Sequence, residues 1–242
     1  MQNKITTNEY CDTGYKNLIF FPEQKKYPIL KKIYKHFKKN NGHHKILEIG
    51  CFPGRFLHNF GKLGYELNGY GQTQYLSNMV NWFKLNNFKI GNFIQTDILV
   101  TNREPRYNIV FSSGFIEHFN NFEYMLEKHI KLVKEKGFIF ITTPNFSGFI
   151  QKTLHKLLDK DNFDKHYIPS MNVDIWKNIL IRNNFNIIDY GYIGGFDFWV
   201  GPEKRNIFKK IIIKIIRLFT LINIYPNNKE YSPEIFIIAQ KI

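Results

Sequence analysis

The chain has 242 residues, of which 43% are hydrophobic and 17% aromatic. A chain of this length and composition can bury a large core, which excludes a disordered protein and a set of peptide-sized modules. The 34 Lys and Arg residues against 20 Asp and Glu residues give a formal net charge of +14, which points to an anionic partner: a nucleic acid, a membrane surface or an acidic metabolite. Because Lys, Asn, Ile, Phe and Tyr are abundant together, compositional bias accounts for part of this charge.

Cysteine usage and hydropathy bear on the compartment. Cys11 and Cys51 are too few for a disulfide framework, which indicates a reducing, cytoplasmic environment. The amino terminus lacks the apolar core of a signal peptide, so we do not expect secretion. The most apolar stretch, 211–222, is interrupted by Lys214 and Arg217 and falls short of the roughly 20 residues that a spanning helix needs. We therefore expect no transmembrane segment.

Short apolar runs alternate with amphipathic stretches up to residue 144. Residues 22–40 predict an amphipathic helix, with Pro22 near its start and lysines at its end. The alternation that follows is typical of a doubly wound α/β fold, in which helices cover both faces of a parallel sheet. The predicted strands are 45–50, 65–70, 92–95, 107–111 and 138–142, and the predicted helices are 55–63, 73–86 and 121–134.

The pattern changes beyond Thr143. Residues 145–170 are polar and aromatic, and we expect irregular structure there. No linker rich in glycine or proline divides the chain, which indicates one domain over residues 1–242. The later elements are predicted as a helix over 173–184, a strand over 185–192, a lysine-rich apolar helix over 207–222 and a strand over 234–240.

The most informative motif is a glycine turn between the first predicted strand and the next helix. Glu48 stands at the strand end, and Gly50 and Gly54 bracket the turn. Such a turn places backbone N–H groups and a carboxylate beside a bound ligand. An ordinary strand-to-helix turn has the same glycines, so the motif alone leaves both interpretations open.

Further segments accompany this turn in a characteristic order. Asp97 ends the third predicted strand, Ser112–Phe119 follows the fourth, and Leu132–Ile139 leads into the fifth. In this order and spacing, the sequence resembles class I S-adenosylmethionine-dependent methyltransferases over roughly residues 25–242. The runs EIGCFPGRFL, GFIEHF and TTPNFSG are most similar to small-molecule O-methyltransferases of surface-polysaccharide biosynthesis.

This resemblance implies a Rossmann-like, doubly wound sheet of seven strands, with the last strand antiparallel between its neighbours and with helical cap insertions. It divides the domain into an N-terminal helical segment (1–44), a cofactor-binding core (45–144), substrate-side insertions with two core elements (145–233) and a closing strand (234–242).

The resemblance also implies residues for the cofactor, S-adenosyl-L-methionine. The turn is expected to hold the methionine end, Asp97 to reach the adenine amino group, and Ile98 to pack against the adenine ring. Tyr70 and Trp82 could lie near the adenosine, but core packing explains them better. The full expected set is Glu48, Gly50, Cys51, Phe52, Gly54, Gly71, Gln72, Asp97, Ile98 and Ser113.

Two positions depart from the family pattern. Phe52 stands where a third glycine is usual, and Gly71 stands where an acidic residue usually binds the ribose hydroxyls. Loss of a charged hydrogen bond costs about 1.5–3 kcal/mol, so cofactor binding weakens tenfold or more unless Gln72 compensates. The site is either rewired, or belongs to a weak or inactive relative.

Two histidines are candidates for the base that methyl transfer to oxygen requires. His118 follows the fourth strand, at the sheet edge where such folds bind ligands, and Glu117 beside it can orient an imidazole or face the cofactor. His166 lies in the irregular segment over the same edge and is the alternative base or a substrate contact. We assign no metal: His43 and His44 have no acidic or cysteine partner at ligand spacing.

Other chemistries are disfavoured. Thr143–Phe146 is not the tetrapeptide by which amino-group methyltransferases hold a flipped base, and neither cysteine has a histidine-paired context for nucleophilic catalysis. The leading hypothesis is O-methylation of a sugar, sugar nucleotide or related anionic precursor of a cell-surface polysaccharide or capsule. The alternatives are an RNA methyltransferase, although no RNA-binding appendage is recognisable, and a catalytically inactive subunit of the same fold.

The predicted helix over 207–222 suggests a further contact. Its projection shows a wide apolar face with Lys210, Lys214 and Arg217 beside it, as in a helix that lies in an anionic membrane interface. Ile213 and Leu218 broaden the apolar surface, which favours a lid or homodimer helix slightly over peripheral membrane contact.

Overall fold

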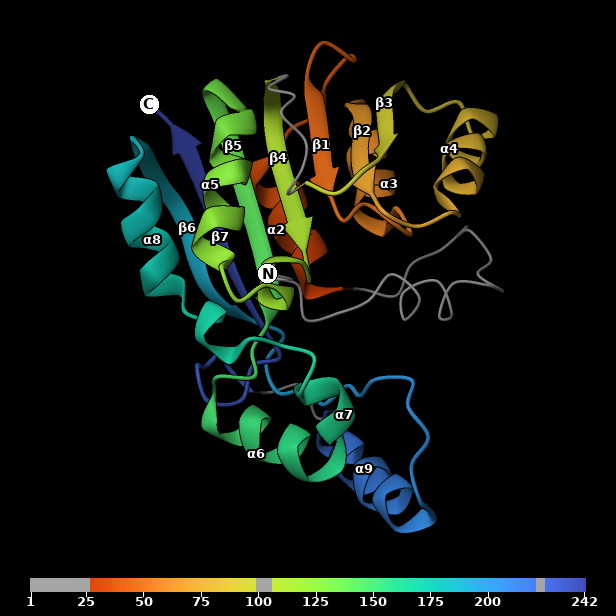
Figure 1. Ribbon diagram of the computed structural model, residues 1–242, viewed down its shortest axis with the longest axis vertical. Coiled ribbons are helices and arrows are strands. Elements are labelled where there is room, and N and C mark those ends of the chain that lie inside the picture. Colours follow the sequence, from red (N-terminus) through yellow and green to blue (C-terminus); the bar gives the residue numbers. More distant parts are fainter. Residues whose placement is uncertain (1–26, 99–105, 221–224) are drawn as a thin grey trace.

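The computed structural model describes residues 27–98, 106–220 and 225–242 (Figure 1). Its centre is a seven-stranded sheet with the strand order β3-β2-β1-β4-β5-β7-β6. Neighbours among the first five strands are parallel, whereas β7 runs antiparallel to both β5 and β6. The expected seven-stranded fold and its antiparallel last strand are therefore confirmed. The strands are β1 (Lys45–Ile49), β2 (Glu66–Gly71), β3 (Ile90–Gln95), β4 (Tyr107–Ser113), β5 (Val133–Pro144), β6 (Phe185–Ile193) and β7 (Glu234–Lys241).

Helices cover both faces of the sheet, and each face has its own core. On one face, Ile33 and Phe60 pack in a hydrophobic cluster with Ile46 of β1. On the other face, Met125 and Trp176 belong to a second hydrophobic cluster. Strands buried on both sides explain why β1, β4 and β5 read as nearly continuous apolar runs. The first face carries α2 (Pro28–His36), α3 (Arg55–Lys62) and α4 (Leu76–Leu85), and the second carries α5 (Phe122–Leu132) and α8 (Val173–Arg182).

Some predicted boundaries were wrong. The helix expected over 22–40 begins at Pro28 and ends at His36, with residues 22–26 and Cys11 outside the described part of the chain. The helix expected over 121–134 ends at Leu132, and β5 starts at the next residue. The register between β4 and β5 shifts there, and Lys136 has φ +60°, so an irregular stretch of strand replaces the expected helix end.

The segment 145–170 is largely helical, which corrects the expectation of irregular structure. It forms α6 (Phe149–Leu158), α7 (Lys160–Phe163) and the short 3-10 helix η2 (Ile168–Ser170). The buried face of α6 carries Gln151 and His155 besides Leu158, so polar residues occupy the positions where a helical pattern requires apolar ones. Leu158 packs with Phe198 and with Ile213 of α9 (Ile207–Thr220), so α6, α7 and α9 form the expected helical cap.

Buried charge holds this cap together. The Asp159 carboxylate accepts hydrogen bonds from the His155 Nδ1–H at 3.1 Å and from the Asn162 side chain at 2.8 Å, and it pairs with the Arg205 guanidinium. The Arg205 guanidinium also donates to the Gly201 carbonyl oxygen at 2.9 Å. These bonds tie the segment before α9 to α6 and α7, because a buried carboxylate without its partners would be strongly destabilising.

Candidate active site

The predicted site segments gather at the edge of the sheet where the parallel strands end. Ile49 of β1 is in register with Ser112 of β4, and Gly71 of β2 with Gln95 of β3. Because β7 runs the opposite way, its first residue, Glu234, lies at the same edge. Open α/β sheets bind ligands at this edge. The segments brought to it are 48–54, 71–72, 97–98 and 112–119.

The turn after β1 requires its two glycines. Gly50 has φ +73° and Gly54 has φ +82°, a left-handed backbone that side chains rarely adopt. A Cβ at Gly50 would lie 2.8 Å from the Phe115 ring, and one at Gly54 would lie 2.5 Å from Met79 Sδ. The N–H groups of Gly50 and Cys51 both donate to the Tyr70 carbonyl oxygen, at 2.9 and 3.1 Å, so this part of the turn is fixed to β2.

Glu48 and Cys51 are buried at the base of the turn. Glu48 is 4% exposed, and burial raises the pKa of its carboxyl well above the usual range, although the Leu57 amide and Arg55 offset part of the effect. Its Oε2 atom has no hydrogen-bond partner within the described part of the chain. Burial first, and then Glu48, raise the pKa of the Cys51 thiol well above its usual value. A protonated, buried thiol agrees with the prediction that Cys51 is not a nucleophile.

The ends of β2 and β3 hold the other expected cofactor residues. A Cβ at Gly71 would make only ordinary contacts, 3.5 Å from Cys51 Sγ and 3.7 Å from Leu76 Cδ1. Gln95 Nε2 donates to the Gln72 carbonyl oxygen at 3.4 Å. Phe52, Gln72, Asp97 and Ser113 are half-buried and Ile98 is buried.

The core interpretation of the two aromatic candidates is confirmed. Tyr70 is 1% exposed and belongs to a core cluster. Trp82 packs on the face of α4 against His58, Phe83 and Phe88.

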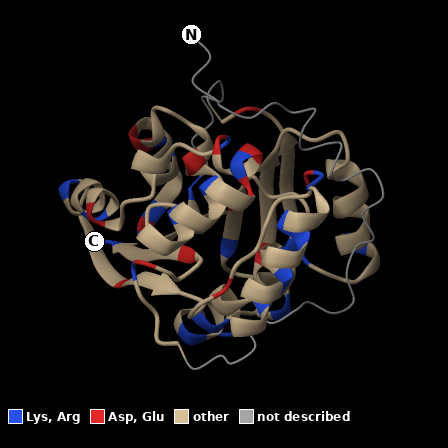
Figure 2. Ribbon diagram, turned by 90° about the horizontal axis from the view of Figure 1, so that it is seen from below, with Lys and Arg blue, Asp and Glu red and all other residues tan. Residues whose placement is uncertain are grey.

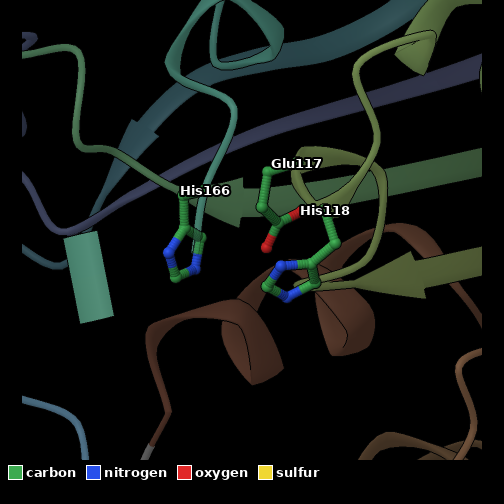
Figure 3. A group of neighbouring side chains, drawn as sticks. All are labelled: Glu117, His118 and His166. Atoms are coloured by element: carbon green, nitrogen blue, oxygen red, sulfur yellow. The ribbon is translucent and has the colours of Figure 1, made fainter. Parts of the chain in front are cut away.

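His118 and His166 meet beside Glu117 at this edge (Figure 3). Glu117 and His118 belong to the short 3-10 helix η1 (Ile116–His118) after β4, and His166 precedes η2. The two imidazole centroids are 4.8 Å apart with a 43° interplanar angle. Figure 3 shows the Glu117 carboxyl group directed toward the two rings. The two histidines predicted as alternatives are therefore neighbours.

Hydrogen bonds fix the two histidine segments against each other. The Tyr167 N–H donates to the Glu117 carbonyl oxygen at 2.7 Å, and the His118 Nδ1–H donates to the Lys165 carbonyl oxygen at 3.0 Å. Since a carbonyl oxygen can only accept, Nδ1 of His118 carries the hydrogen, and Nε2 has the lone pair in the neutral ring.

The two titratable side chains beside His118, Glu117 and His166, both have shifted pKa values that favour their neutral forms. Burial, and then the neighbouring His118, lower the pKa of His166 to about 3. Burial raises the pKa of Glu117 to about 8, and neither carboxyl oxygen has a hydrogen-bond partner among the described residues. His118 therefore faces a neutral imidazole and a protonated carboxyl group. This contrast in pKa between close groups is typical of acid–base sites.

A family model described as a methyltransferase domain matches residues 21–190, which include the glycine turn, Asp97 and the Glu117–His118 pair. The chain belongs to this methyltransferase family. It is therefore a methyltransferase.

Curated relatives are distant. The Ubiquinone biosynthesis O-methyltransferase of Pelagibacter ubique is 24% identical over 163 residues, which are 60% of this chain and 67% of that protein. The enzyme of the same name from Rickettsia akari is 26% identical over 48% of this chain, and the match spans about half of that protein, 47%. The (S)-coclaurine N-methyltransferase of Papaver somniferum is 22% identical over 71% of this chain and 53% of its own length.

Solved structures agree with the fold. A SAM-dependent methyltransferase from Archaeoglobus fulgidus superimposes with a TM-score of 0.57 at 19% identity, over 88% of this chain and 93% of that chain. A magnesium protoporphyrin IX methyltransferase from Synechocystis, solved with bound SAH, gives a TM-score of 0.54 at 12% identity, over 84% of this chain and 76% of that chain. At these identities the likeness concerns the fold.

The residues of this methyltransferase fit S-adenosylmethionine. The Glu48 Oε2 atom is buried and lacks a donor within the described chain, as expected of an acceptor that a bound ligand satisfies. The adjoining turn holds its shape through two left-handed glycines, which pack too closely on Phe115 and Met79 to carry side chains. The unpartnered Glu48 oxygen suits the charged amino group of S-adenosylmethionine, which would favour ionisation of the buried carboxyl group.

The histidine cluster also has the donor types of a cation site. One potential ligand atom each from Glu117, His118 and His166 lies within 4.8 Å of the others. Burial opposes the ionised Glu117 that a cation would require, but a bound cation would itself favour ionisation. The sequence interpretation weighed only His43 and His44 for a metal, and both are exposed.

Sequence reasoning missed two polar residues at this edge. Burial, and then Asp197, raise the pKa of Glu234 to about 7, and its Oε2 has no partner among the described residues. The antiparallel direction of the closing strand could have signalled that its first residue lies at this edge. His129 is buried and accepts a hydrogen bond from Ser112 Oγ at 3.0 Å, which anchors the end of β4.

Proposed function

We propose that this methyltransferase transfers the methyl group to a hydroxyl oxygen of a small acceptor, with His118 as the base. The observation that carries the proposal is the His118–His166 pair at the carboxyl edge of the sheet, beside Glu117. Such a transfer depends on alignment of the acceptor and on removal of its proton. A neutral imidazole suits the second task at physiological pH.

S-adenosylmethionine supplies a methyl group that is already activated by a positively charged sulfur. We assign its methionine end to the turn after β1, and the buried, unpartnered oxygen of Glu48 supports this assignment. We assign the adenine to Asp97 and Ile98. The remaining assigned contacts are Gly50, Cys51, Phe52, Gly54, Gly71, Gln72 and Ser113.

The proton moves to Nε2 of His118 in this proposal, because Nδ1–H is engaged with the Lys165 carbonyl oxygen. His166 is held in the same tautomer by the Asn162 carbonyl oxygen, which accepts its Nδ1–H at 2.7 Å. The low pKa of His166 keeps that ring neutral, so the pair carries at most one charge. His166 is therefore the positioning neighbour, and it becomes the base only if His118 proves dispensable.

Two classes of acceptor are to be distinguished. The sequence motifs led to a sugar, sugar nucleotide or anionic glycan precursor, whereas four of the five curated relatives are named for ubiquinone biosynthesis. The half-buried Trp199 side chain suits a ring-shaped acceptor of either kind, because both sugars and phenols stack on aromatic faces. The ring centroid of Trp199 lies 5.6 Å from that of Phe146, and the Phe146 centroid lies 4.8 Å from that of His166.

The experiment measures methyl transfer from labelled S-adenosylmethionine to a panel of sugar nucleotides, phenolic quinone precursors and RNA. On the accepted substrate, His118→Ala lowers turnover by roughly 100-fold or more and leaves cofactor affinity nearly unchanged. His43→Ala, an exposed histidine, serves as the matched control and keeps full turnover. Full turnover in both His118→Ala and His166→Ala would refute the assignment, and transfer to RNA alone would refute the small-molecule acceptor.

A chelator distinguishes a histidine cluster that accepts a proton from one that binds a cation. If the cluster acts as a proton acceptor, turnover is unchanged by EDTA. A loss that added Mg²⁺ restores would assign Glu117, His118 and His166 to a cation instead.

A further inference from the structure

The outward face of α9 is apolar and exposed. Only Ile213 is buried; it packs with Phe198 and Leu158, and Arg217 Nε donates to the Phe198 carbonyl oxygen at 3.1 Å. Of the two residues that favoured protein contact on a second side, Ile213 packs inside the chain, whereas Leu218 is 57% exposed. The exposed apolar side chains, between 40% and 75% accessible, are Ile207, Phe208, Ile211, Ile212, Ile215, Leu218 and Phe219.

These seven side chains share one side of the helix. At 100° per residue they fall within roughly 140° of its circumference. Lys210, Lys214 and Arg217 follow on the adjoining flank, and α9 contains no acidic residue. A contiguous exposed apolar surface of this kind marks an interaction site.

The neighbouring helix repeats the pattern. α6 packs against α9 through Leu158, yet Phe149 is 71% and Leu157 is 64% exposed. Lys152 and Lys156 are exposed on the same helix. Both helices lie at one end of the molecule, below the sheet edge that carries the site in Figure 1, and Figure 2 views that end directly.

We propose that α9 seats this end of the protein on an anionic membrane surface. The apolar face enters the boundary between headgroups and acyl chains, while the lysine stems extend so that the ammonium groups reach the lipid phosphates. Among the described residues, no helix is both long and apolar enough to cross a bilayer, so the contact is peripheral. The surface is separate from the histidine cluster, and the inference does not depend on the acceptor.

Charge favours a membrane over a second copy of the chain. Pairing two α9 helices would bring together two sets of Lys209, Lys210, Lys214 and Arg217 with no acid on either helix. Each copy also carries a net charge of +14. An anionic lipid surface removes this repulsion, and each basic residue near it adds to the attraction.

The test is flotation of the full chain with phosphatidylcholine vesicles, with and without phosphatidylglycerol. We expect binding only to the anionic vesicles, and weaker binding as salt is raised. Lys210→Glu/Lys214→Glu lowers the partition coefficient by about tenfold or more. Ile211→Ser/Ile215→Ser, which keeps every charge, also lowers it.

The matched control is Lys38→Glu/Lys39→Glu, which makes the same change in net charge at two exposed lysines between α2 and β1. It is expected to keep nearly all of the binding. No binding of the wild type at low salt, or an equal loss in the control, overturns the proposal. Sedimentation that shows a dimer which Ile211→Ser/Ile215→Ser dissociates overturns it in favour of a second copy.

Discussion

Gly71→Asp tests how the end of β2 meets the cofactor. The resemblance implies an acid there that binds the ribose hydroxyls. A Cβ at Gly71 makes only ordinary contacts, at 3.5 and 3.7 Å, and the backbone there is not left-handed, so the variant is expected to fold. A charge-assisted hydrogen bond contributes about 1.5–3 kcal/mol, and burial of the new carboxylate offsets part of it. The expected net gain of about 1–2 kcal/mol tightens binding by about fivefold to thirtyfold.

Titration calorimetry with S-adenosylmethionine measures this gain. Gly71→Asn has the same shape without the charge and is expected to gain less. Gly69→Asp is the contrasting variant, because its Cβ would lie 2.6 Å from Cys51 Sγ and 2.8 Å from the Phe93 ring, which destabilises the fold. Unchanged or weaker affinity in a folded Gly71→Asp protein, or an equal gain in Gly71→Asn, would refute the placement of the ribose at this strand end.

Two further predictions concern stability. Burial lowers the pKa of His129 to about 4, so the unfolded chain binds a proton that the native ring does not, and stability is lost as pH falls from about 6.5 to about 4. The free energy of unfolding therefore falls by about 2 kcal/mol between pH 8 and pH 5 because of this residue. In urea unfolding, the stability of His129→Gln is expected to depend less on pH than that of the wild type. Parallel pH dependences of the two proteins would contradict this prediction. Gly54→Ala is expected to cost about 2–4 kcal/mol, because φ is +82° and its Cβ would lie 2.5 Å from Met79 Sδ and 2.9 Å from Phe83. Gly114→Ala, with φ +64° but no atom closer than 3.5 Å, is expected to cost only about 1–2 kcal/mol, and equal losses would show that packing at Gly54 is unimportant.

The sheet could be predicted because its strands are buried on both faces. β1 and β4 appear in the sequence as apolar runs that end in turn residues, and the glycines of the first turn are required by backbone conformation. The helices of the cap were harder to predict than the sheet, because the buried positions of α6 include Gln151 and His155. Gln151 Nε2 donates to the carbonyl oxygens of Asp197 and Tyr231, and His155 pairs with Asp159. Polar residues at buried helix positions leave no apolar period to detect.

The site was predicted in part for a similar reason. Sequence order placed His118 at the strand edge, but its approach to His166 depends on tertiary hydrogen bonds, such as that from the Tyr167 N–H to the Glu117 carbonyl oxygen. The burial that raises the pKa of Glu117 to about 8 arises from packing, which no local pattern encodes. Glu234 required the strand order as well as the sequence.

Cofactor use is tested most directly by titration of S-adenosylmethionine into the purified full chain and into His118→Ala. We predict saturable binding to both proteins, competed by S-adenosylhomocysteine, with turnover of the accepted substrate lowered roughly 100-fold or more in His118→Ala. Absence of binding at millimolar ligand, with circular dichroism showing both proteins folded, would show that this chain does not use S-adenosylmethionine.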